Sequence, residues 1–134
     1  MTRTTLGFYI AAAYNFCIII FSQGFSSGLG EIDPLFSPAG CVGVLLWGAA
    51  YFALANRYAV APAVALVFAV EKAFYGIHWL LWMSEHSGEL SAMREADALT
   101  GGFYAIYGAG DLAFMVFFAW VVWTWRDRLS GALS

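Results

Sequence analysis

Three ionisable residues lie inside apolar stretches of this sequence, where a charge is unfavourable. Glu71 and Lys72 are adjacent in the middle of "ALVFAVEKAFYGIHWLLWM", and Asp111 interrupts "GFYAIYGAGDLAFMVFF". A charged side chain at the centre of a bilayer costs at least about 2.5–3.5 kcal/mol, so such residues face the protein interior and are often functional. Two carboxyl groups beside one ammonium group are the components of a proton relay, of a polar binding site, or of an ion pair that only fixes helix register.

Helical periodicity places further polar and aromatic residues on the same faces. Each residue of an α-helix turns by about 100°, which puts Tyr75 and His78 on the face of Glu71. Other polar or amphipathic residues fall near the middle of the remaining apolar stretches. The predicted ligand-binding or proton-relay residues are Glu71, Lys72, Asp111, Tyr75, His78, Tyr107, Tyr104, Asn15, Trp47 and Tyr51.

The elements that must position these residues are four long apolar runs. The chain has 134 residues, of which 62% are hydrophobic and 11% charged, and a soluble domain of this length is far less apolar. Each run has close to the ~20 residues that a helix needs to cross a membrane. The predicted fold is an all-α integral membrane four-helix bundle, with residues 1–134 forming one transmembrane domain. Its predicted spans are about 6–22, 38–55, 61–83 and 102–125.

The positively charged residues predict the orientation of these spans. If the N-terminus is cytoplasmic, four arginines lie in cytoplasmic segments and only Arg94 lies in an outer loop. The positive-inside rule therefore favours both termini in the cytoplasm. Acidic residues of the outer loops, including Asp33, are expected to be solvated. An alternative reading of run 6–22 is a cleaved signal peptide, because Arg3 precedes it and a small-residue context follows.

Other chemistries find little support in the residue types. The net charge of −3 and the absence of a basic stripe predict no nucleic-acid partner. The two histidines and two cysteines have no metal-site spacing, so no metal, cofactor or catalytic residue is predicted. Cys17 and Cys41 are expected to be buried free thiols. Whether the protein is an enzyme stays open, but catalysis is less favoured than binding or transport.

A stripe of small residues predicts where the last span packs. Ala105, Ala109 and Ala113 recur at intervals of four residues in run 102–125. Small side chains let membrane helices approach each other closely. This stripe is therefore expected to contact another helix.

The layout of several motifs resembles a group of small bacterial membrane proteins. The motifs are "DPLFSP", "WGAAYFALA", "EKAFYGIHW" and "YGAGD", and the similarity covers about residues 34–118. In this layout the chain is similar to small uncharacterised four-helix proteins that are loosely grouped as DoxX-like. The resemblance implies a multi-pass helical bundle in the bacterial cytoplasmic (inner) membrane. It carries over no catalytic residue.

Two functions remain as hypotheses. The first is binding of a lipid, a quinone-like ring or another small hydrophobic ligand, or of a partner subunit, by the intramembrane polar and aromatic residues. The second is proton- or ion-coupled transport through Glu71, Lys72 and Asp111, which predicts that this group holds one proton more than free side chains would. A transporter of four helices encloses little space and is expected to form a homo-oligomer or to join a larger membrane complex.

Overall fold

The computed structural model of the protein describes residues 1–26 and 28–133, and all the regular structure in that part of the chain is helical. The long helices are α1 (Arg3–Phe21), α3 (Pro38–Leu54), α4 (Pro62–His86) and α6 (Ala98–Thr124). Short elements connect or follow them: α2 (Leu29–Ile32), the 3₁₀ turns η1 (Pro34–Phe36) and η2 (Ser87–Glu89), α5 (Leu90–Ala96) and α7 (Arg126–Leu133).

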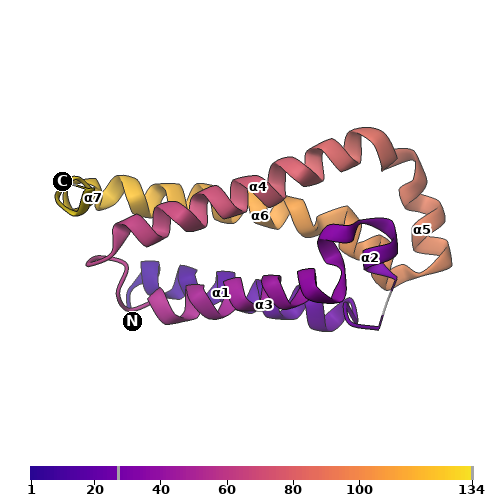
Figure 1. The fold of residues 1–134 in the computed structure, drawn as a ribbon, viewed down its shortest axis with the longest axis horizontal. Helices are drawn as coiled ribbons and strands as arrows, with labels where there is room; N and C mark the ends of the chain where they lie inside the picture. The colour runs from indigo at the N-terminus through magenta and orange to yellow at the C-terminus, as the bar shows by residue number, and fades with distance from the viewer. Residues whose placement is uncertain (27, 134) are drawn as a thin grey trace.

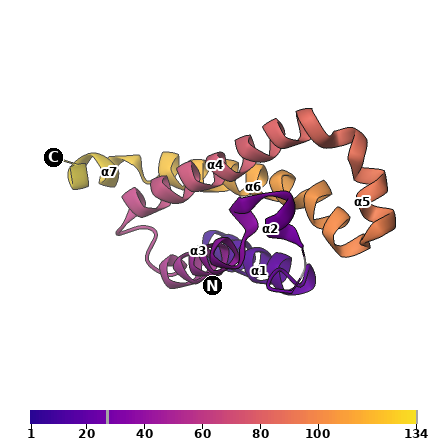
Figure 2. The same cartoon turned by 45° about the vertical axis from the view of Figure 1, so that its right-hand side comes forward.

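The four long helices form two layers of antiparallel pairs. Helix α1 packs along α3, α4 packs along α6, and α1 also contacts α6 between the layers (Figure 1). Both termini lie at one end of the molecule, and α5 lies at the other end in both views (Figure 2). The polar connection after α4 holds η2 and α5.

Three helical segments are long and apolar enough to cross a membrane, judged by length and composition alone. They are Arg3–Phe21, Pro62–Ala96 and Ala98–Thr124, and they correspond to the first, third and fourth predicted spans. The second predicted span contains α3, an apolar helix of only 17 residues. Its length of about 26 Å is near the lower limit for crossing the hydrocarbon layer.

Local sequence signals explain where the helices begin and end. Ser37 caps α3 by accepting a bond from the amide of Gly40 at 3.2 Å, and Pro38 occupies the first helical position, where its missing N–H is not needed. Helix α1 ends where Gln23 adopts a positive φ of 54°, and the Gly24 amide then bonds back to the Ile19 carbonyl at 2.9 Å. This is the Schellman arrangement, which satisfies carbonyl groups at a helix end.

The interior consists of two apolar clusters with a polar layer between them. One cluster is built around Phe8, with Tyr51, Phe68, Phe118 and Val121 among its buried members. The other contains Leu29, Phe36, Cys41, Trp82 and Phe103. Along each of α1, α4 and α6, the buried ionisable or amide side chains fall between the positions that belong to the two clusters, and they are Asn15, Glu71, Lys72 and Asp111.

The small-residue stripe of α6 does not pack as expected. Ala109 and Ala113 are exposed, so within this chain the stripe is not an interface, and that prediction is wrong. Close approach occurs instead at two glycines of α6, one facing α4 and the other facing α1. A Cβ atom on Gly108 would lie 2.0 Å from Cγ of Trp79, and one on Gly110 would lie 2.4 Å from the hydroxyl of Tyr14.

Candidate functional site

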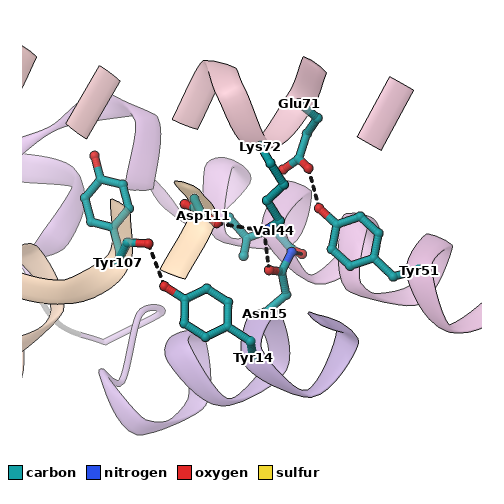
Figure 3. A network of polar contacts seen from close by, with 8 residues as sticks. All are labelled: Tyr14, Asn15, Val44, Tyr51, Glu71, Lys72, Tyr107 and Asp111. Atoms are coloured by element: carbon teal, nitrogen blue, oxygen red, sulfur yellow. Dashed lines mark hydrogen bonds and ion pairs between the residues drawn. The ribbon is translucent and has the colours of Figure 1, made fainter. Parts of the chain in front are cut away.

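Lys72 is the centre of the polar layer. Its ammonium Nζ lies 2.7 Å from Oδ1 of Asp111 on α6 and 2.8 Å from Oδ1 of Asn15 on α1 (Figure 3). Only 1% of the Lys72 surface is exposed. Because a buried charge needs a partner and hydrogen bonds to be tolerated, these contacts explain how α4 carries an ammonium group in the interior.

Asn15 extends this contact to the fourth long helix, α3. Its amide Nδ2 donates to the backbone carbonyl of Val44 on α3 at 3.0 Å, while its Oδ1 accepts from Lys72. Val44 lies one turn before Gly48, where the two helices are so close that an added Cβ would be 3.1 Å from Cβ of Asn15. The polar layer therefore links all four long helices through one amide and one ammonium group.

Glu71 is buried next to Lys72 in sequence but has a different partner. The hydroxyl of Tyr51 on α3 donates to Oε2 of Glu71. Of the two carboxyl groups that the sequence offered to Lys72, only Asp111 lies within ion-pair distance of it. The ammonium and the two carboxyl groups thus belong to one layer with two separate sets of hydrogen bonds.

Aromatic rings surround the ammonium group of Lys72. Its Nζ lies 5.1 Å from the ring centre of Tyr51, 5.6 Å from that of Tyr14 and 5.9 Å from that of Phe114. Rings within about 6 Å attract a cation through their negative faces. Tyr14 is also fixed from outside the layer, because its hydroxyl donates to the backbone carbonyl of Tyr107.

A small cavity of about 20 Å³ adjoins the polar layer. Glu71, Lys72 and Asp111 line it together with Tyr75 and Tyr107, among other residues. One water molecule needs roughly 10–15 Å³ measured in this way. The Tyr107 hydroxyl is buried and has no hydrogen-bond partner among the described residues. The site therefore has space for a single water molecule near two carboxyl groups.

The structure gathers seven of the ten predicted site residues at or beside this layer. Asn15, Tyr51, Glu71, Lys72 and Asp111 belong to the contacts above, and Tyr75 and Tyr107 line the small cavity.

The other three predicted site residues lie elsewhere in the bundle. Trp47 packs edge-on against Phe68 beside the Phe8 cluster. The hydroxyl of Tyr104 donates to the Leu29 carbonyl at 2.9 Å, so it holds α2 against α6.

His78 contacts Asp33, an acidic residue that the sequence analysis expected to be solvated. Its Nε2 lies 2.6 Å from Oδ2 of Asp33, and Asp33 is buried rather than solvated. The other carboxylate oxygen of Asp33 accepts from the Leu35 amide at 3.0 Å and caps η1. This pair therefore ties the segment before α3 to the C-terminal half of α4, away from Lys72.

Tyr14 is the residue that the sequence analysis missed. It precedes Asn15 and lies about 100° from it around α1, and that adjacency was the available signal. It lines the small cavity on one side and a much larger groove on the other. Ile18 and Phe103 also line both, so these three side chains lie between the polar layer and the groove.

The larger groove runs between α1 and the start of α6. Its volume is about 660 Å³, within the roughly 300–1,000 Å³ typical of small-molecule sites. Its lining residues are mostly apolar, with Arg94 from α5 the one charged member: Tyr14, Cys17, Ile18, Phe21, Ser22, Arg94, Ala98, Leu99, Gly102, Phe103, Ala105 and Ile106. Cys17, expected to be buried, is an exposed free thiol in this groove, whereas Cys41 is buried and also free.

No protein-family model matches the chain, and comparison with curated proteins and with solved structures finds no significant match. The resemblance to DoxX-like proteins therefore stays a prediction. Among the described residues, no group of three or more histidine, cysteine, aspartate or glutamate side chains is placed to hold a metal ion.

Proposed function

We propose that this protein is a four-helix integral membrane protein that binds a small hydrophobic molecule in the groove between α1 and α6. In this proposal α3 crosses the membrane with the three longer helices, both termini are cytoplasmic, and the membrane is the bacterial inner membrane. Large apolar side chains that point outward support insertion, among them Ile20, Leu46, Val70, Leu81 and Val116, each at least 49% exposed. Soluble monomers rarely expose so much apolar surface to water, and in this proposal lipid covers it.

The observation that carries the binding proposal is the position of Tyr14. Together with Ile18 and Phe103, this residue lines both the groove and the cavity beside Lys72. A hydrophobic molecule in the groove would contact the Tyr14 ring, whose other neighbours are the Lys72 ammonium and the Tyr107 carbonyl. Binding sites commonly combine an apolar concavity with a few polar groups that fix orientation, and this groove has that composition.

Photolabelling with a diazirine-bearing fatty alcohol tests the binding proposal. We expect saturable labelling of the peptides that contain Cys17–Ser22 and Ala98–Ile106, with competition by unlabelled alcohol. Ala105→Trp, which fills the groove, should abolish that labelling. The matched control Val70→Trp lies on an exposed face of α4 and should leave it unchanged. Uniform, non-saturable labelling of all exposed apolar faces would contradict the proposal.

The orientation has its own test. In a Cys17→Ser background, Gly28→Cys and Leu90→Cys place thiols in the two connections that the proposal puts outside. A membrane-impermeant maleimide should label both in intact cells, because four of the five arginines fall in the segments assigned to the cytoplasm. Labelling only in inverted vesicles would reverse the orientation.

Proton-coupled transport is the second candidate, and one observation favours it. The small cavity, with space for one water molecule, touches both Glu71 and Asp111, while Lys72 forms an ion pair with Asp111 and not with Glu71. Such a water-connected pair of carboxyl groups is the kind of arrangement that relays protons in membranes.

Infrared titration in lipid tests the relay. We expect a protonated carboxyl band at neutral pH that disappears in Glu71→Gln or in Asp111→Asn. If both groups titrate like free side chains, the relay should be dropped. Binding in the groove would be unaffected by that result.

A further inference from the structure

The groove has one feature that hydrophobic binding alone does not use, which is the cation at its end. Arg94 is the single charged side chain among the lining residues. Neither its guanidinium nor any other atom of its side chain has an ion-pair or hydrogen-bond partner among the described residues, although three acidic residues, Glu89, Glu95 and Asp97, are near it in sequence. The Asp97 carboxylate is already engaged, because it accepts from Thr100 Oγ1 at 2.7 Å and from the first amides of α6.

Packing holds the stem of Arg94 in place. A Cβ atom added to Gly101 would lie 2.4 Å from Cγ and 2.6 Å from the backbone N of Arg94. Helix α5 therefore lies directly against the first turn of α6 at this point. The cation is positioned by backbone contact at the groove, and it is not carried on a loose loop.

The lining of the groove changes from charged at one end to apolar along the rest of its length. Arg94 belongs to the polar connection between α4 and α6, which would lie at the level of the lipid headgroups. From there the lining becomes apolar and continues along α1 from Ser22 to Tyr14, about 12 Å along the helix axis. A cation at the membrane surface followed by an apolar channel toward its middle complements a molecule with an anionic head and one apolar chain.

We propose that the ligand of the α1–α6 groove is a single-chain anionic amphiphile, with its headgroup at Arg94 and its chain directed toward Tyr14. This inference rests on the proposed hydrophobic binding and adds the charge and the orientation of the ligand. Arginine suits the role because its planar guanidinium donates two parallel hydrogen bonds to a phosphate or carboxylate.

The native thiol of Cys17 reports occupancy without any added label. It is exposed in the groove, whereas Cys41 is buried and serves as an internal control for unfolding. The protein is placed in phosphatidylcholine nanodiscs, and alkylation of each thiol by N-ethylmaleimide is followed by mass spectrometry. Lysophosphatidylglycerol is compared with lysophosphatidylcholine of the same chain length.

We expect the anionic lipid to protect Cys17 at about tenfold lower concentration than the zwitterionic lipid, as for one charge-assisted hydrogen bond. Arg94→Gln should remove that difference and retain protection by either lipid at high concentration. Arg57→Gln, which removes an arginine near the opposite end of the bundle, is the matched control and should preserve the preference.

Each other outcome is decisive. Equal protection by the two lipids, or an unchanged preference in Arg94→Gln, overturns the anionic ligand while hydrophobic binding stands. No protection by either lipid overturns both proposals. Protection that needs no added lipid and rises with protein concentration identifies a second copy of the chain as the occupant and also overturns the inference.

Discussion

Lys72 at the centre of the molecule and Arg94 at the edge of the groove are cations with opposite surroundings. Lys72 is 1% exposed and contacts a carboxylate, an amide oxygen and three aromatic rings. Arg94 is exposed and has no such partner among the described residues. The difference follows from hydration, because a cation that water cannot reach must be neutralised by the protein, whereas one at the surface keeps its water.

The contrast separates a structural role from a binding role. Lys72 is held inside the bundle by two hydrogen bonds and three aromatic rings, so its removal should damage the fold before it alters any ligand. The contacts of Arg94 are incomplete, so its removal should alter a ligand and leave the fold intact. Substitutions at matched positions of the polar layer and of the groove test this division.

The largest expected effect comes from methionine at each cation. Lys72→Met leaves Asp111 buried without its cation and should lower the free energy of unfolding by about 3–5 kcal/mol. Arg94→Met should change it by no more than about 0.5 kcal/mol, because the side chain is exposed. Unfolding in mixed detergent measures both. The double variant Lys72→Met/Asp111→Leu should recover most of the lost unfolding free energy. Equal effects of Lys72→Met and Arg94→Met would contradict the division between a structural cation and a binding cation.

The two tyrosines around Lys72 give a smaller contrast. Tyr51→Phe removes the hydroxyl that donates to buried Glu71 and should lower the free energy of unfolding by about 1.5–3 kcal/mol, as for a hydrogen bond to a charged group. Tyr14→Phe removes a bond to a backbone carbonyl and should cost about 0.5–1.5 kcal/mol. The same unfolding assay ranks them. A larger loss in Tyr14→Phe would mean that the bond from Tyr14 to the Tyr107 carbonyl stabilises the polar layer more than the bond from Tyr51 to Glu71 does.

Two glycines of α6 distinguish the packed face from the open one. A Cβ on Gly108 would overlap Cβ and Cγ of Trp79, so Gly108→Ala should lower the free energy of unfolding by about 1–3 kcal/mol. Gly102 lines the groove with nothing within 4 Å of an added Cβ, so Gly102→Ala should raise it by up to about 1 kcal/mol through helix propensity. Thermal unfolding in detergent should show the opposite signs. Destabilisation by Gly102→Ala would indicate that the groove is filled.

The smallest effect concerns the cap of α6 beside the groove. Hydrogen bonds from the Thr100 hydroxyl, then from its amide and that of Leu99, hold the pKa of the Asp97 carboxyl below its usual value. Because the folded pKa is the lower one, this stabilisation is present above the unfolded pKa and is lost as the pH falls through the folded pKa.

Thr100→Val should therefore raise the pKa of Asp97 in the folded protein toward its ordinary value. The loss of unfolding free energy that protonation of Asp97 causes at acid pH should then be smaller. A carboxyl NMR titration measures this shift, with Glu95→Gln as the control that leaves Asp97 unchanged. An unaltered Asp97 titration in Thr100→Val would show that the Thr100 hydroxyl does not set it.

Much of the helical content was predictable, because its signals are local. The predicted spans 6–22 and 102–125 correspond closely to α1 and α6, since long apolar runs and caps such as Asp97 act within a few residues. The predicted span 38–55 likewise corresponds to α3, whereas the four-span membrane arrangement stays a proposal. The small-residue stripe was wrong because periodicity identifies a face of a helix without identifying what that face meets.

The sequence by itself determined that Glu71, Lys72 and Asp111 would share the interior, because a charged side chain in an apolar helix is costly on the lipid-facing surface. Only the tertiary structure decided that Lys72 pairs with Asp111 and that Glu71 turns to Tyr51, because the rotation of each helix relative to its neighbours selects the partner. The groove was likewise decided in three dimensions. The space between α1 and α6 depends on how the two helix pairs pack together, and no local pattern of residues encodes that volume.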